Sequence, residues 1–227
     1  MNVEILCTPG NSAAKCILQA GEHITAEGGS MIAMSGNMEI ETTTHQKGKG
    51  GILKGLKRMF AGENFFLNHY TADSHGGEVL LSTTLAGDMQ VHELDNEKLI
   101  VQSGSFVACE PTIDIDMGWE GFKNLFSKES LFWLHMKGSG KVIFNSFGAI
   151  YPIEVKDEYI VDTGHIVAFE ETLNFSLSKA GKSWFSSFLG GEGLVCKFKG
   201  QGTVWCQSHN PASFGWSIGP LLPSRKA

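Results

Sequence analysis

The sequence predicts a mainly β protein that contains three internal repeats. Glycine is abundant, at 28 of 227 residues, and it separates many short apolar runs. This spacing is typical of tight turns between strands. One pattern of glycines and apolar residues also occurs three times in the same order along the chain. We therefore expect a single compact domain over residues 1–227, made of repeats at approximately 15–90, 91–150 and 151–216.

The first block of the repeat predicts a glycine turn followed by two short strands. It reads GGSMIAMSGNMEIE at 28–41, SGSFVACEPTIDID at 103–116 and TGHIVAFEETLNFS at 163–176. Three glycines align across the copies, and apolar residues follow them at identical spacing: Gly29, Gly104 and Gly164. The alternation in MEIE and IDID places every second side chain on a buried face of a sheet.

A short amphipathic helix and a glutamate follow in each repeat. The helical patterns are ILKGLKRMF, WEGFKNLF and GKSWFSSFL, each with apolar residues on one face. Helices of about two turns are not stable alone, so they must pack against another element. The glutamate after each helix recurs as Glu63, Glu129 and Glu192. We interpret it as a structural residue that binds backbone N–H groups at the turn.

A hairpin around glycine ends each repeat. Its three copies are GGEVLLST at 76–83, GSGKVIFN at 138–145 and GQGTVWCQ at 200–207. A mostly sheet unit of this size cannot cover its own apolar face. We therefore expect the three units to share one core, with internal pseudo-threefold symmetry.

Composition and charge limit the class of protein. The net charge of −6 argues against a general nucleic-acid binder. The five cysteines are odd in number and have no C-x-x-C spacing, so we expect reduced, mostly buried thiols. The start, MNVEILCTPGNS, has no signal-peptide pattern, and no apolar run reaches the roughly 18–20 residues that span a bilayer. We expect a cytoplasmic protein, at most peripheral to a membrane.

The motifs of common catalytic and cofactor sites are missing from the sequence. Gly50 and Gly55 have the spacing of a phosphate loop, but Leu56 stands where that motif needs lysine. His69 and His135 occupy equivalent places, yet the third copy has Phe198 there, which indicates a packing position. We predict that the protein is not an enzyme and has no catalytic, cofactor or metal site.

One basic stretch is peculiar to the first repeat. Five basic residues fall close together around the first helical pattern: Lys47, Lys49, Lys54, Lys57 and Arg58. They form a candidate surface for an anionic membrane or a protein partner. The alternative is that each helix buries its apolar face on its own sheet and that the lysines are simply solvated.

Three stretches carry a resemblance to a known family. GGSMIAMSGNMEIE, GGILKGLKRMFAGENFFLNHYTA and GLVCKFKGQGTVWCQSHN resemble bacterial and archaeal proteins of unknown function. That family is related to the mitochondrial biogenesis protein "altered inheritance of mitochondria 24". The resemblance covers nearly the whole chain. It implies a triplicated tryptophan-RNA-binding-attenuator-like fold, a short double-stranded β-helix that builds ring-like assemblies, and an organising role at the inner membrane in mitochondrial members.

These patterns together predict a non-enzymatic assembly, scaffold or binding module that associates with a membrane or a partner. The resemblance also implies a homo-oligomer, with a trimer as one form. The alternative is a nucleic-acid or small-ligand binder that uses the β-helix surface. RNA is the less favoured partner, because the basic stretch is not repeated in the second and third units.

Overall fold

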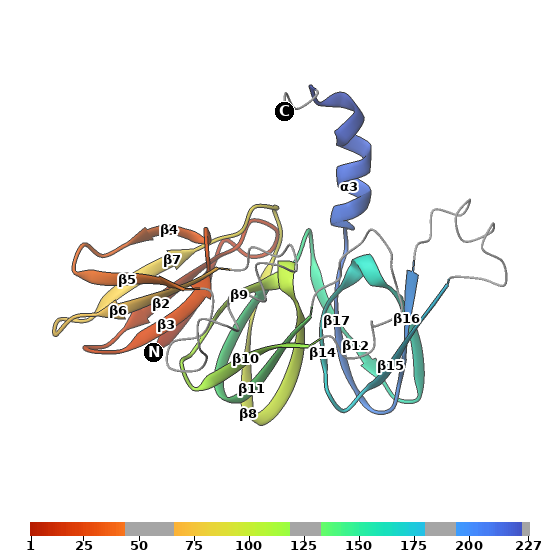
Figure 1. Ribbon diagram of the computed structural model, residues 1–227, viewed down its shortest axis with the longest axis horizontal. Helices are drawn as coiled ribbons and strands as arrows, with labels where there is room; N and C mark the ends of the chain where they lie inside the picture. The colour runs from red at the N-terminus through yellow and green to blue at the C-terminus, as the bar shows by residue number, and fades with distance from the viewer. Residues whose placement is uncertain (44–65, 119–132, 180–193, 224–227) are drawn as a thin grey trace.

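The computed structural model describes residues 1–43, 66–118, 133–179 and 194–223. Within these ranges strand is the predominant structure, which confirms the mainly β prediction (Figure 1). The three expected short helices, at 52–60, 119–126 and 181–189, lie outside the described residues. The described α-helix, α3 (Pro211–Ile218), was not predicted from the sequence.

The strands form three sheets. A four-stranded sheet has the order β1 (Asn2–Leu6), β2 (Ala13–Leu18), β7 (Gly77–Leu81) and β4 (Met31–Met34). The largest sheet has the order β12 (Ile150–Val155), β17 (Gly202–Gln207), β14 (Ile166–Glu170), β8 (Met89–Gln102), β11 (Trp133–Asn145), β9 (Phe106–Cys109), β3 (His23–Glu27), β6 (Leu67–Ala72) and β5 (Met38–Thr43). In that sheet β10 (Ile113–Gly118) also pairs with β11. The third sheet is β13 (Glu158–Asp162), β16 (Leu194–Lys199) and β15 (Asn174–Lys179).

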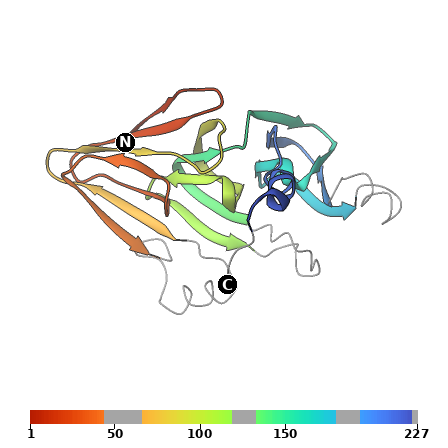
Figure 2. The ribbon, with the colours of Figure 1, turned by 90° about the horizontal axis from the view of Figure 1, so that it is seen from above.

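Figure 1 shows three groups of strands in a row, and the view from above in Figure 2 agrees. The first group contains β1 to β7, the middle group β8 to β11, and the last group β12 to β17. The expected pseudo-threefold symmetry is not found among the described residues. The reason is the way the groups join: β3 pairs with β9, and β8 pairs with β14. Each group is thus attached to the next through one strand edge, which produces a row.

The buried apolar residues form three clusters instead of the single shared core that we expected. The first group buries Tyr70, the middle group Phe106 and the last group Phe198, each with none of its surface exposed. The middle cluster also takes in Leu67 of the first group and Trp205 of the last. The clusters therefore meet at the junctions, and burial of their apolar surface stabilises the row as well as each group.

Candidate functional site

The three glycines that align in the sequence have different local roles. Gly29 is in the turn before β4 and adopts a φ of +91°, which favours glycine. Gly104 and Gly164 lie in the short 3₁₀ turns η1 (Ser103–Ser105) and η2 (Thr163–His165). At Gly164 an added Cβ would lie 2.1 Å from the Asn210 side chain. Gly164 therefore makes room for the residue that caps α3.

The other candidate residues predicted from the sequence lie outside the described residues. The basic set lies at 47–58, and the repeated glutamates at 63, 129 and 192. The membrane-surface hypothesis for Lys47, Lys49, Lys54, Lys57 and Arg58 thus stays a prediction, as does the turn role of Glu63, Glu129 and Glu192.

A different set of side chains binds backbone N–H groups at three turns. Ser35 Oγ accepts from Glu78 N at 3.0 Å, and Glu110 Oε2 accepts from Lys141 N at 2.8 Å. Glu170 Oε2 accepts from Thr203 N at 3.0 Å. Sequence reasoning missed these residues, although each lies six places after a repeated glycine. The change from serine to glutamate hides their common role.

His69 is buried in the first group, as its packing interpretation requires. Its Nδ1 lies 2.9 Å from Thr25 Oγ1, and its Nε2 lies 2.9 Å from Thr43 Oγ1. Both ring nitrogens therefore have hydroxyl partners. Within the described ranges no group of three or more His, Cys, Asp and Glu side chains is placed to hold a metal ion.

The five cysteines are all unpaired, and only Cys7 is exposed. Burial raises the pKa of the Cys16, Cys196 and Cys206 thiols to about 12. Burial also raises the pKa of Cys109. These four thiols therefore stay protonated and unreactive at neutral pH, as expected for packing residues.

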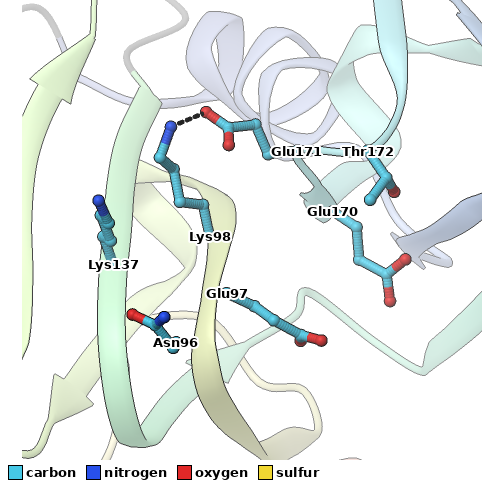
Figure 3. A pocket seen from close by; sticks show the side chains of 7 residues that line it. All are labelled: Asn96, Glu97, Lys98, Lys137, Glu170, Glu171 and Thr172. Carbon is cyan, nitrogen blue, oxygen red and sulfur yellow. Dashed lines mark hydrogen bonds and ion pairs between the residues drawn. The ribbon is translucent and has the colours of Figure 1, made fainter.

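A charged hollow of about 490 Å³ lies where the last group joins the middle group (Figure 3). Its lining consists of Asn96, Glu97, Lys98, Lys137, Glu170, Glu171 and Thr172. Lys98 Nζ and Glu171 Oε1 form an ion pair of 2.5 Å across the junction, and both side chains are partly exposed. A solvent-exposed pair adds at most about 1 kcal/mol of stability.

The chemistry of this hollow is limited. Glu170 already binds the backbone of β17, and Lys98 is paired with Glu171. The lining offers ammonium and carboxylate groups. The hollow can hold a small polar ligand through ion pairs.

Large apolar side chains are exposed singly on several described elements, such as Ile40 of β5 and Tyr151 of β12, and in pairs or larger sets on three others. In β4 they are Met31 and Ile32, and in β13 they are Tyr159 and Ile160. The third element is the C-terminal segment of α3 and η3 (Gly219–Leu221), whose exposed residues are Phe214, Trp216, Leu221 and Leu222. These side chains are the most conspicuous surface feature of the described residues, because exposed apolar groups on strand edges favour association.

The helix α3 is held only at its base. Asn210 Oδ1 accepts from Ala212 N at 2.9 Å and Ser213 N at 3.2 Å, which caps the first turn. The Phe214 ring lies 5.2 Å from the Phe147 ring. Figure 1 shows the rest of the helix projecting away from the sheets, and none of its residues is buried. In the described part of the chain, no helix is long and apolar enough to cross a membrane.

Comparison with known proteins identifies the relatives of the chain. The family model described as mitochondrial biogenesis AIM24 matches residues 3–209. An uncharacterized protein of Streptococcus pyogenes serotype M6 is 28% identical over 214 residues, which cover 91% of this chain and 85% of that protein. A Streptococcus pyogenes protein of known crystal structure is similar with a TM-score of 0.81 at 23% identity, over 97% of this chain and 99% of that one. The structural likeness shows a shared fold.

Proposed function

Because the chain belongs to the mitochondrial biogenesis AIM24 family, we propose that it is a non-enzymatic assembly or scaffold module that self-associates. The observation that carries this proposal is the exposed apolar surface on the edge strands β4 and β13. Proteins normally protect such edges with charge, proline or a covering element. The five unpaired cysteines fit a reducing compartment, and we place the protein in the cytoplasm.

We also propose that the three groups are copies of one attenuator-protein-like, double-stranded β-helix-like unit. The antiparallel pairs β5–β6, β10–β11 and β15–β16 support this, since each has the same place in its group. The bonds of Ser35, Glu110 and Glu170 recur at the turn before β5, β10 and β15. A protein built by repeating one unit is well suited to scaffolding, because its binding surfaces are repeated too.

Light scattering after size exclusion tests self-association. We expect the mean mass of the wild-type protein to rise with concentration above that of one chain, because association follows mass action. A mass of one chain at every concentration, up to the solubility limit, would show that the protein is not a self-associating module. The number of copies at the plateau decides whether a trimer forms.

A second candidate, association with a membrane or a partner, is favoured by α3. Trp216 is 68% exposed on a helix that projects from the body. Tryptophan and leucine side chains partition into the membrane interface. We expect Trp216→Ser to reduce flotation with phosphatidylglycerol vesicles severalfold, whereas Ser213→Ala, on the same helix, leaves it unchanged. Equal flotation of both variants and the wild type would exclude α3 as the contact. Nucleic-acid binding stays a prediction from the sequence.

A further inference from the structure

Several described strands lie at sheet edges, among them β4 in the first group and β13 in the last, whose counterparts in other groups are paired on both sides. Among the described residues, β4 pairs with β7 alone, and β13 pairs with β16 alone. The strands in the corresponding places have two neighbours each. β9 lies between β11 and β3, and β14 lies between β17 and β8.

Side chains on β4 and β13 are more exposed than those at the corresponding positions of the strands that are paired on both sides. Ile32, the second residue of β4, is 54% exposed, whereas Val107 and Val167 at the same place in β9 and β14 are 0% exposed. Ile160, the third residue from the end of β13, is 54% exposed. Ile100, at the same place in β8, is 5% exposed because β14 covers it. The two edges are thus apolar surfaces of a kind that the chain buries elsewhere.

The two junctions within the chain use one register. Ala26, the penultimate residue of β3, lies opposite Ala108, the third residue of β9. Val101, the penultimate residue of β8, lies opposite Ala168, the third residue of β14. The chain therefore joins one group to the next in the same way twice. In each case the strand before one aligned glycine, β3 or β8, pairs with the strand after the next aligned glycine, β9 or β14.

We propose that β13 of one copy pairs antiparallel with β4 of a second copy, in this same register. The proposal rests on the proposed function and specifies its partner as another copy of this chain. Val161 of one copy then lies opposite Ala33 of the next, and Ile160 lies opposite Met34. Since the two edges differ, the contact is head to tail, and copies add until a ring closes or a filament grows.

The sequences of the two edges suit such a contact. β4 reads MIAM and has no charged residue, and β13 reads EYIVD, with charges only at its ends. Strand addition gives main-chain hydrogen bonds along both edges and buries Ile32, Tyr159 and Ile160 in the same step. In Figure 1 β4 lies in the first group, on the left, and the last group, which contains β13, lies on the right.

Charge at either edge tests the contact. We expect the Ile32→Lys and the Ile160→Lys variants each to have the mass of one chain. The dissociation constant for self-association should rise at least tenfold in both. An equal mixture of the two is expected to form a complex of two chains and to stop there. The reason is that Ile32→Lys retains an intact β13 and Ile160→Lys an intact β4. The matched control is Ile40→Lys, since Ile40 is 44% exposed on β5 outside the contact; it should assemble as the wild type does.

Cysteine pairs test the register. Directly opposed residues of antiparallel strands lie within the range of Cα separations that a disulfide bridges. In a Cys7→Ser background, a mixture of Ile160→Cys and Met34→Cys is expected to cross-link between chains on oxidation, whereas neither cross-links alone. Cross-linking of one variant with itself would show a symmetric contact and overturn the proposal.

The outcomes separate this inference from the proposed function. If the wild type assembles but both lysine variants assemble equally well, the β13–β4 contact is wrong and self-association stands. If the wild type is a single chain throughout, both are wrong. Circular dichroism of the lysine variants should match the wild type, because both substituted side chains are already exposed in one chain.

Discussion

At the scale of single residues, most buried polar side chains and thiols serve packing, and one carboxyl group has a strongly shifted pKa. His69 and the four buried cysteines are packing residues. Glu27, the last residue of β3, differs, because burial raises the pKa of its carboxyl group from 4.5 to about 7. Its charged form is therefore disfavoured in the folded protein near neutral pH.

This shift predicts a dependence of stability on pH that comes from one residue. A carboxyl group whose pKa is higher folded than unfolded stabilises the fold fully below pH 4.5, and this contribution is lost as pH rises through about 7. The difference in unfolding free energy between Glu27→Gln and the wild type should therefore change with pH. We expect it to move in favour of the variant by about 2–3 kcal/mol from pH 4 to pH 8. Urea denaturation across this range measures it; a difference that does not change with pH would contradict it.

At the scale of elements, alternation and glycine spacing predicted the strands of the first block well. The turn before β4, the strands β9 and β14, and the hairpin strands β7 and β17 all lie where the pattern placed them. The capping of the turns could not be predicted in the same way. Ser35, Glu110 and Glu170 do one job with two residue types, and hydrogen bonds to a distant backbone N–H leave no periodic signal.

The bond of Glu110 predicts a loss of stability at one turn. Glu110 Oε2 accepts from Lys141 N at 2.8 Å, and the two main chains also bond there, from Glu110 N to Lys141 O at 2.9 Å. Glu110→Ala leaves the amide without its acceptor, which costs about 1–2 kcal/mol of unfolding free energy. Glu110→Gln keeps an accepting oxygen and should stay near the wild type, as should Glu154→Ala at an exposed position of β12. Equal loss in the Gln and Ala variants would point to charge in place of the hydrogen bond.

At the scale of the whole molecule, the decisive feature is the row of three groups. The two internal junctions have one register, and the unlike apolar edges of β4 and β13 are left exposed. In a closed pseudo-threefold arrangement these edges would have covered each other within one chain. In the row each has one described partner strand, and the proposed assembly would supply the second.

Local structure follows directly from the sequence, because glycines and alternating apolar residues set turns and strands within a few residues of one another. Which strands are covered depends on how the groups pack in three dimensions. MIAM in β4 and FVAC in β9 are similarly apolar, and the aligned glycine precedes both by two residues. Yet β9 is buried between two neighbours, and β4 is exposed. Burial depends on what lies across the strand edge, and that neighbour is distant in sequence.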